Sequence, residues 1–394
     1  MSAPVFVCLT NIPTSYRLFQ FARMNEALLE RGWNFEVWFM AGSERGREWT
    51  FAPSAFRFPH RFLRGVHLRV GPNSLHCNHE LLRALRDTHP EILLVAGAWI
   101  HPTVWAAALS SVPQRTIFWS ESHLRSIRRN GPVTRFARRQ VLSKFQEFAV
   151  PGALAKEYVE HHTHAPCIRL LPNLVNPSVF RNDSAKRRNS APFDRDNQDR
   201  RVLLIVARLA TEKGLLPFFE GISRLNREDR SRLTVLIAGS GPLRSKLAHW
   251  IVDRDLDIRF LGQQHESRIA ELYAQADGFC LPSLWEPNPL SVIEALWAGL
   301  PLLLSSRVGN HPECLQVGKN GFIYDPCSVE DVSRAVSAWL ALSREELTHF
   351  GRVSLAIARE RFDPDRVISG FLDDVLDASN TAAGESVVAS TSAR

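Results

Sequence analysis

The sequence lacks the features that mark several special classes of protein. No apolar run approaches the roughly 18 residues that a membrane-spanning helix needs, and the short N-terminal apolar run, residues 5–9, has no basic segment before it. The cysteines are scattered, without the paired spacing of a metal site: Cys8, Cys77, Cys167, Cys280, Cys314 and Cys327. We therefore predict a cytoplasmic protein with reduced thiols, and no membrane span, secretory signal peptide, disulfide framework or bound metal.

The charge is biased towards the basic side. Lys and Arg number 48 against 41 Asp and Glu in 394 residues, which gives a net charge of +7. Such a balance favours anionic partners, namely nucleotides, phospholipid surfaces or nucleic acid. Nucleic acid has the least support of the three, because the sequence shows no aromatic platform and no known nucleic-acid-binding motif.

Both halves of the chain alternate short apolar runs with amphipathic helical stretches. The runs include residues 5–9, 34–40 and 91–95 in the first half and residues 202–207 and 234–238 in the second. Runs that are apolar on both faces are typical of buried parallel strands. The pattern therefore predicts two doubly wound, Rossmann-like α/β domains.

Composition sets the domain boundaries. Residues 181–201 carry many charges of both signs and almost no apolar side chains, which is typical of a linker, and the last residues, SNTAAGESVVASTSAR, are small and polar. We predict an N-terminal domain at 1–180, a linker at 181–200, a C-terminal domain at 201–378 and a disordered tail at 379–394. Because open α/β sheets bind ligands beyond the carboxyl ends of their strands, the loops there are the candidate site.

A helix is predicted within LPSLWEPNPLSVIEALWAGLP, residues 281–301. Asn288 can cap this helix, and Pro289 suits its first position, where the missing N–H has no intrahelical partner to lose. Gly299 is then the glycine that follows the helix. The free amides of Leu290 and Ser291 at its start suit a phosphate group.

Charged side chains lie on or near two of these loops. Glu286 precedes the helix and can hold sugar hydroxyls, and Glu294 lies inside it and can hold ribose hydroxyls, although a solvated helix face is the alternative interpretation. Arg208 and Lys213 follow a strand and can stabilise a diphosphate as it leaves, the alternative being ordinary surface charge.

A glycine-rich turn, AGSGPL at residues 238–243, follows another strand. Gly239 and Gly241 can let a ligand approach the backbone there. A tight turn without a ligand explains them equally well, because the turn matches neither the G-x-G-x-x-G pattern nor the P-loop.

Taken together and in order, these segments resemble the donor-binding domain of retaining GT-B glycosyltransferases of family 4. The matching pieces are ARLATEKG, VLIAGSGPL, FLGQQ, LYAQADGFCLPSLWEPNPLSVIEALWAGLP and VGKNGFIYDP, with Glu286 and Glu294 in the family's E-x7-E spacing. The resemblance implies two Rossmann-like domains that face a cleft, and a hexosyltransferase-like activity that retains anomeric configuration. It also implies that no metal or other cofactor is bound, since the nucleotide-sugar is itself a substrate.

The resemblance also implies roles for individual residues. Arg208 and Lys213 would bind the donor diphosphate, Glu294 the ribose and Glu286 the sugar ring, and Gly262 would lie beside the base. The sequence departs from the family at Asn288–Pro289, where an aromatic–glycine pair is usual. Since proline has no N–H, the departure removes or moves one backbone hydrogen bond to the donor.

The N-terminal half resembles the family more loosely. Asn173 matches a Pro-Asn turn of the family, and Asn176 stands where aspartate is usual. The first loop lacks the common glycine pair, and Arg17 is its candidate replacement, with an exposed arginine as the alternative. In FWSESH, residues 118–123, Glu121 and His123 are candidates for contact with the donor sugar, with ordinary loop polar residues as the alternative.

A basic run follows these candidates. It comprises Arg125, Arg128, Arg129, Arg135, Arg138, Arg139 and Lys144, with apolar residues between them. An amphipathic basic helix can dock on anionic lipid at the inner face of the membrane, and a solvated helix is the alternative.

The sequence therefore predicts a retaining, metal-independent glycosyltransferase for cell-envelope or polysaccharide synthesis. Its predicted partners are a nucleotide-sugar and a saccharide or lipid-linked acceptor. The alternatives are transfer to a soluble small molecule and a non-catalytic binding protein with the GT-B fold.

Overall fold

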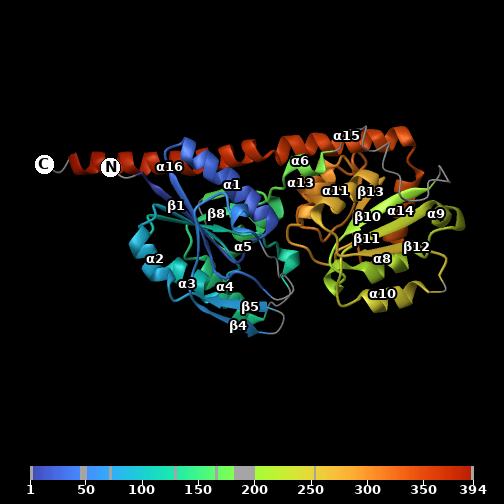
Figure 1. Cartoon of the computed structure of the whole chain (residues 1–394), viewed down its shortest axis with the longest axis horizontal. Helices are drawn as coiled ribbons and strands as arrows, with labels where there is room; N and C mark the ends of the chain where they lie inside the picture. Colours follow the sequence, from blue (N-terminus) through green and yellow to red (C-terminus); the bar gives the residue numbers. More distant parts are fainter. Residues whose placement is uncertain are drawn as a thin grey trace. The chain divides into compact units, whose positions relative to one another are not determined.

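The computed structural model describes residues 3–44, 51–70, 73–127, 131–164, 167–181, 200–252 and 254–391. The chain divides into two compact units (Figure 1). Unit 1 comprises Met1–Glu121, Arg128–Leu174 and Pro364–Arg394, and unit 2 comprises Ser122–Ile127 and Val175–Asp363. The predicted linker at 181–200 falls almost wholly outside the described residues.

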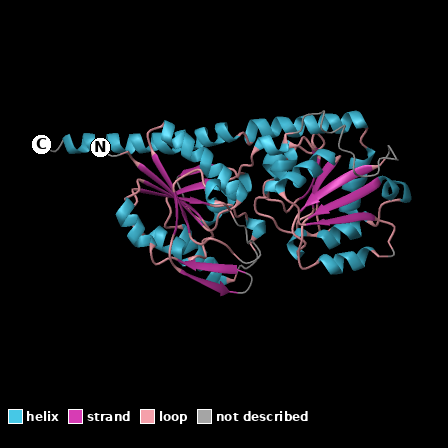
Figure 2. Cartoon of the chain, viewed as in Figure 1, coloured by secondary structure: helices cyan, strands magenta, loops and turns pink. Residues whose placement is uncertain are grey.

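Unit 1 is built on a sheet with helices around it (Figure 2). The strands of this sheet are parallel and lie in the order β3-β2-β1-β6-β7-β8-β9. Its strands are β1 (Val5–Thr10), β2 (Asn34–Phe39), β3 (His60–Phe62), β6 (Ile92–Ala96), β7 (Arg115–Trp119), β8 (Glu147–Val150) and β9 (Cys167–Leu170). The central strands are apolar on both faces, as expected of strands covered by helices on both sides. A separate antiparallel hairpin, which the sequence analysis did not identify, pairs β4 (Val66–Val70) with β5 (Asn73–Cys77).

Helices connect these strands. They are α1 (Ser15–Glu30), η1 (Pro53–Ala55), α2 (Leu81–Thr88), α3 (Pro102–Leu109), α4 (Pro132–Leu142) and α5 (Ala153–His162). Helix α1 begins after Thr14, whose hydroxyl accepts a hydrogen bond from the backbone N–H of Arg17. The helix ends before Gly32, whose φ of 77° reverses the chain into β2.

Unit 2 has a second parallel sheet, in the order β12-β11-β10-β13-β14-β15. Its strands are β10 (Arg201–Val206), β11 (Leu233–Ala238), β12 (Asp257–Gly262), β13 (Gly278–Leu281), β14 (Leu302–Ser305) and β15 (Gly321–Tyr324). Side chains that alternate along β10 enter different cores: Leu204 packs in one cluster, and Leu203 and Ile205 pack in another. The sheet is therefore covered by helices on both faces, as the apolar runs predict.

The helices of unit 2 complete the doubly wound arrangement. They are η2 (Leu124–Ser126), α6 (Pro177–Phe180), η3 (Thr211–Lys213), α8 (Leu215–Ile222), α9 (Arg227–Arg232), α10 (Arg244–Ile251), α11 (Glu266–Gln275), α12 (Leu290–Trp297), α13 (His311–Cys314), α14 (Val329–Ala341) and α15 (Arg344–Arg361). Helices α11, α12 and α15 contribute to one core cluster, and α8, α10 and α14 contribute to the other.

The last helix, α16 (Pro364–Thr391), differs from the sequence-based boundaries. Residues 364–378, assigned above to the C-terminal domain, belong to unit 1 instead. The reason is apolar packing, because Ile368, Phe371 and Leu372 are buried in the core that also holds Phe6 and Phe21. The helix also continues to Thr391, through most of the segment predicted to be a disordered tail.

No helix in the described part of the chain is both long and apolar enough to span a membrane.

Candidate functional site

The candidate site of unit 2 lies on three loops that follow neighbouring strands. Strands β10, β13 and β14 are adjacent and parallel, so the loops after Val206, Leu281 and Ser305 leave the same edge of the sheet. This edge is the place where open α/β sheets bind ligands.

The first two loops meet through an ion pair between Lys213 and Glu286. The Lys213 ammonium contacts Glu286 Oε2, and both side chains are less than one-fifth exposed. Gly214 makes the close approach of the loops possible, since a Cβ there would lie 2.1 Å from the carbonyl oxygen of Pro282. Its φ of 63° also favours glycine. Two residues that the sequence analysis treated separately are therefore partners.

Further hydrogen bonds fix the loop that carries Glu286. The Ser283 hydroxyl donates to Glu286 Oε2 over 3.3 Å. The backbone carbonyl of Glu286 accepts from the Gly309 N–H at 2.8 Å and from the His123 imidazole Nε2 at 3.1 Å. A Cβ at Gly309 would lie 1.8 Å from the Pro287 carbonyl oxygen, so only glycine lets the third loop pack here.

His123 thus contacts the backbone of Glu286. It is 2 % exposed, and the segment Ser122–Ile127 that carries it belongs to unit 2. The imidazole therefore orients the loop of Glu286 by donating its Nε2–H to a carbonyl. Its predicted catalytic role stays a prediction.

Glu294 lies inside α12 and is held by a residue that the sequence analysis missed. The hydroxyl of Tyr273, on α11, lies 2.8 Å from Glu294 Oε2 and 2.9 Å from the Ser291 carbonyl oxygen. Burial raises the pKa of the Glu294 carboxyl to about 7, and the hydrogen bond from Tyr273 opposes part of that rise. The contact joins two different helices, so no local sequence pattern predicts it.

Helix α12 begins one residue later than predicted. Pro289 has a ψ of 130° and is the N-cap, so Leu290 is the first helical residue and Asn288 does not cap the helix. The buried amide of Asn310 donates to the Pro289 carbonyl oxygen at 2.9 Å and holds the proline in this extended conformation. The first backbone N–H groups of the helix, those of Leu290 and Ser291, have no intrahelical acceptor. The glycine after the helix is as predicted, with a φ of 66° at Gly299.

Arg208 follows β10 but takes no part in the Lys213–Glu286 ion pair. Its guanidinium contacts Glu212 at 3.2 Å, and its side chain is 55 % exposed. An exposed pair of this kind contributes little to stability, so the arginine is free to turn towards an anion.

The glycine-rich turn supports the loop of Arg208. A Cβ at Gly239 would lie 2.0 Å from the Ala207 carbonyl oxygen, and one at Gly241 would lie 2.4 Å from that of Leu209. The Gly239 N–H donates to the Gly262 carbonyl at 2.8 Å. Close backbone packing therefore explains Gly239 and Gly241, whereas Gly262 has open space at its Cβ position.

Unit 1 has its own polar cluster at the carboxyl end of its sheet. Arg17 is 6 % exposed, so the alternative interpretation of an exposed arginine is wrong, and its contact with phosphate stays a prediction. Its guanidinium contacts Glu121 at 2.6 Å and stacks over the Trp119 ring at 3.8 Å. The Asn173 amide donates to the same carboxylate at 3.0 Å. Asn176, by contrast, caps α6 in unit 2.

The basic run divides in the structure. Arg128 and Arg129 lie outside the described residues. Arg138 is buried, whereas Arg135, Arg139 and Lys144 are exposed on or just after α4. The run is therefore partly an exposed basic face and partly core.

Comparison with known proteins assigns the fold. Residues 186–353 match the family model described as glycosyl transferases group 1. In structure, HepE of Anabaena in complex with UDP superposes with a TM-score of 0.73 and 13 % identity over 95 % of this chain and 100 % of HepE. The chain has the GT-B fold. The fold class predicted from the sequence is thus confirmed.

Two curated relatives each match part of the chain. The glycogen synthase of Mycobacterium tuberculosis is 30 % identical over 43 % of this chain and 41 % of its own length. An Escherichia coli protein, UDP-Gal:alpha-D-GlcNAc-diphosphoundecaprenol alpha-1,3-galactosyltransferase, is 29 % identical over 37 % of each chain. The chain spans about two fifths of the length of the first curated relatives that it matches.

Proposed function

We propose that this GT-B protein transfers a sugar, of hexose type, from a nucleotide-sugar to a hydroxyl acceptor with retention of anomeric configuration. The observation that carries the proposal is the grouping of Lys213, Glu286 and Glu294 with the start of α12 at one edge of the unit 2 sheet. The match to the group 1 glycosyltransferase model covers this same region.

The donor diphosphate is assigned to the positive groups of this edge. Lys213 and Arg208 supply two cations, and the start of α12 supplies backbone N–H groups aligned with the positive end of the helix dipole. In the structure Lys213 is already held in place by Glu286. When the donor binds, Lys213 shares its charge with the phosphate, and Glu286 is left to accept hydrogen bonds from sugar hydroxyls.

The ribose is assigned to Glu294. Its carboxylate is fixed by Tyr273 through Oε2, which leaves Oε1 as the acceptor for the ribose hydroxyls. A carboxylate that is partly withdrawn from water forms stronger hydrogen bonds than a fully solvated one. Ribose binding would explain why a carboxyl group is buried here although burial raises its pKa and disfavours its ionised form.

In the chemical step, the acceptor oxygen forms a bond to the anomeric carbon on the same face of the sugar ring from which the diphosphate departs. The carbon–oxygen bond to the diphosphate breaks, and the acceptor proton passes to a phosphate oxygen of the leaving group. Lys213 and Arg208 stabilise the charge that grows on this group, so the reaction is proposed to need no metal or other cofactor.

The acceptor is proposed to be a saccharide or lipid-linked saccharide of the cell envelope or a polysaccharide, made on the inner face of the membrane. The Escherichia coli relative is named for transfer to a diphosphoundecaprenol-linked sugar, which supports this class. A soluble small-molecule acceptor is the second candidate.

The proposal is tested by the release of nucleotide from a panel of UDP-, GDP- and dTDP-sugars. Wild-type protein is expected to release nucleotide from one donor, and Glu294→Ala is expected to lose donor binding and release without unfolding. Glu360→Ala, at an exposed position of α15, is the matched control and should behave as wild type. Donor affinity that is unchanged in Glu294→Ala would refute the assignment.

Binding without release is the outcome expected of a non-catalytic GT-B protein. An enzyme that lacks its acceptor gives the same result, with nucleotide binding that calorimetric titration detects. Addition of an extract that contains the acceptor separates the two cases, because only the enzyme then turns over. Release that survives EDTA supports metal independence, and nuclear magnetic resonance of the product anomer tests retention.

A further inference from the structure

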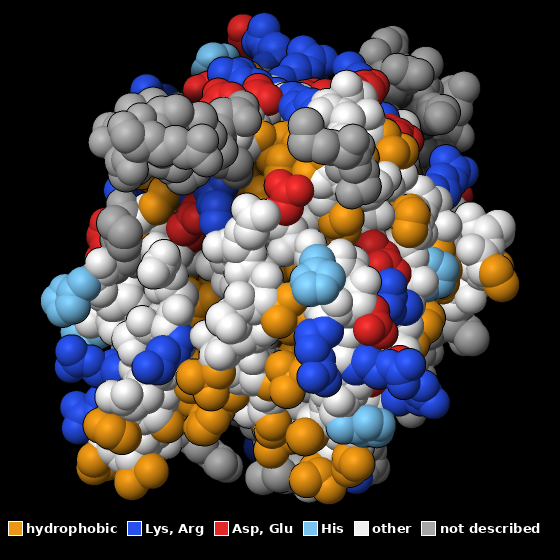
Figure 3. Space-filling model, turned by 90° about the vertical axis from the view of Figure 1, so that its left-hand side faces the viewer, with side chains coloured by type: hydrophobic (Ala, Val, Ile, Leu, Met, Phe, Trp, Pro, Cys, Tyr) orange, Lys and Arg blue, Asp and Glu red, His pale blue; other side chains and the backbone are white. Residues whose placement is uncertain are grey.

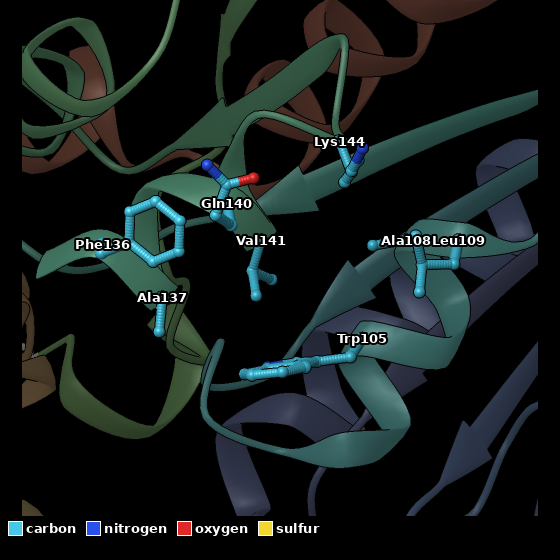
Figure 4. Close-up of a pocket in the computed structure, with 8 residues that line it drawn as sticks. All are labelled: Trp105, Ala108, Leu109, Phe136, Ala137, Gln140, Val141 and Lys144. Atoms are coloured by element: carbon cyan, nitrogen blue, oxygen red, sulfur yellow. The ribbon is translucent and has the colours of Figure 1, made fainter. Parts of the chain in front are cut away.

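Helices α3 and α4 of unit 1 leave an open groove between them (Figure 4). The groove has a volume of about 290 Å³. Its lining is apolar except for one amide and one ammonium at the edge, and consists of Trp105, Ala108, Leu109, Phe136, Ala137, Gln140, Val141 and Lys144. None of these residues belongs to the site described above.

Both helices expose large apolar side chains towards this groove. Helix α3 already buries Thr103, Val104 and Ala107 in unit 1, yet Trp105 and Leu109 remain 41 % and 69 % exposed. On α4, Phe136 is 67 % exposed. Since a monomer rarely leaves large apolar side chains gathered at a surface, the groove has the character of a binding surface.

Cations stand on the same surface. Arg135, Arg139 and Lys144 are exposed beside the groove, and within the described part of the chain no ion pair is formed by any of them. Neither the α3 sequence PTVWAAAL nor the α4 sequence PVTRFARRQVL contains an acidic residue. Arg138, by contrast, points inward, 3.4 Å from His162, so α4 separates one structural arginine from two exposed ones.

We propose that this groove binds one acyl chain of an anionic lipid and thereby docks unit 1 on a bilayer. The apolar lining matches the hydrocarbon, and Arg135, Arg139 and Lys144 match the negative headgroups around it. A groove with so few polar groups cannot recognise a free sugar or nucleotide, which needs several directed hydrogen bonds.

The orientation of Trp105 agrees with this occupant. Its indole N–H donates to the Trp99 carbonyl oxygen at 2.6 Å, so the polar edge of the ring is satisfied by the protein and the ring surface is left for hydrocarbon. Tryptophan in such a half-exposed position is typical of membrane interfaces.

The apolar surface extends beyond the groove. Val133 on α4 is 82 % exposed, and Val66 and Leu68 on the hairpin are each 56 % exposed. The hairpin strand β5 packs against α3. Hydrophobic side chains gather at the lower edge of the face in Figure 3, the edge at which Figure 1 shows α4 and the hairpin, with Lys and Arg side chains above them. A bilayer surface covers all three elements at once, which a single short peptide would not.

This inference rests on the proposed function, because docking of unit 1 on the membrane brings the enzyme to a lipid-linked acceptor. Membrane docking and the proposed transferase function can nevertheless be tested, and refuted, separately. Nucleotide release from the donor depends on unit 2, whereas docking depends on α3 and α4.

The test is co-sedimentation of the full chain with phosphatidylcholine vesicles, with and without phosphatidylglycerol. Wild-type protein should sediment with the anionic vesicles only, and high salt should release it. Leu109→Ser with Phe136→Ser should weaken partitioning about tenfold or more through lost apolar burial, and Arg135→Gln with Arg139→Gln roughly 30-fold through lost charge attraction.

Matched controls change the same residue types elsewhere. Leu29→Ser with Val317→Ser removes two side chains that are 55 % and 60 % exposed, and Arg352→Gln with Arg359→Gln removes two exposed arginines of α15. Both controls should sediment as wild type, and all four double variants should release nucleotide from the donor at the wild-type rate.

Insertion of a chain into the groove is measured by quenching with brominated acyl chains. The protein has ten tryptophans, so the difference between wild type and Trp105→Phe isolates the signal of Trp105. Equal quenching in the two proteins, or sedimentation that the groove variants do not reduce, would overturn the proposal. Concentration-dependent dimerisation that the groove variants abolish, without vesicle binding, would assign the groove to a second copy of the chain and would equally overturn it.

Discussion

Replacement of Glu294 by glutamine should stabilise the protein at neutral and alkaline pH while weakening donor binding. The Glu294 carboxyl accepts a hydrogen bond from Tyr273, and a glutamine carbonyl can accept the same bond. The ionised form of the glutamate, however, is disfavoured by burial, which raises its pKa from 4.5 to about 7. The substitution removes this penalty and keeps the shape of the side chain.

The sign and size of the effect follow from proton linkage. Between pH 4.5 and 7 the folded state binds more protons than the unfolded state, so the free energy of unfolding of the wild type falls as pH rises. A shift from 4.5 to about 7 corresponds to about 3 kcal/mol. Because the Glu294 residue is only partly buried, water screens part of this energy, and we expect a gain for Glu294→Gln of about 1–3 kcal/mol at pH 8.

The assay is urea unfolding of wild type and Glu294→Gln at pH 5 and pH 8. The two proteins should have similar stability near pH 4.5 to 5, and the variant should be the more stable one at pH 8. Glu360→Gln, at an exposed position, serves as the control and should change neither value. A stability difference that is independent of pH, or one that shrinks as pH rises, would show that the carboxyl group is not held in the environment described here.

Two further predictions concern other charged or titratable groups. Lys213→Met removes the partner of Glu286 and the cation assigned to the leaving diphosphate. Turnover should therefore fall by about two orders of magnitude, while donor affinity, measured by calorimetry, should fall much less. Equal losses of turnover and affinity would show that the lysine contributes only to binding of the ground state. Burial lowers the pKa of His101 from 6.5 to about 4, with a smaller contribution from His76. Between these two pH values the unfolded state binds more protons than the folded state. The free energy of unfolding of the wild type should therefore fall by up to about 3 kcal/mol as pH falls from 6.5 to 4. His101→Asn, which keeps an acceptor for the N–H of His76, should lack this pH dependence in urea unfolding, and an unchanged profile would contradict the assignment.

The two parallel sheets could be predicted because buried parallel strands have a strong local signature. Residues 234–238, for example, lie within β11, Leu233–Ala238, and its side chains are buried on both faces. The hairpin of β4 and β5 carries no such signature, because Val66, Leu68 and their neighbours are largely exposed. The assignment of α16 to unit 1 could not be predicted either, because its apolar face could pack against either domain and the sequence pattern does not distinguish them.

The site could be predicted only as far as the loops that carry it. The places of Glu286 and Lys213 after strands predict that both belong to the site, and the strand order β10-β13-β14 brings their loops together. The groups that position them were missed: Ser283, Gly309 and Tyr273 act across loops or helices that are distant in sequence. The helix start shows the same limit, because Asn310 rather than a local cap determines the conformation of Pro289.

These contacts give the Asn288–Pro289 departure a physical interpretation. In a loop with a glycine at position 289, a backbone N–H would be available to the donor phosphate. Here the proline ring removes that N–H and fixes φ near the observed −74°, while Asn310 fixes the carbonyl. The loop therefore loses one donor but gains rigidity, and the positive field at the start of α12 must act through Leu290 and Ser291. With one backbone donor fewer, the proposed diphosphate site depends more on the side-chain cations of Lys213 and Arg208. Both cations interact with the diphosphate, which every nucleoside-diphosphate sugar shares. In the proposed reaction, specificity for the donor would therefore arise from the sugar and ribose contacts assigned to Glu286 and Glu294 rather than from the diphosphate.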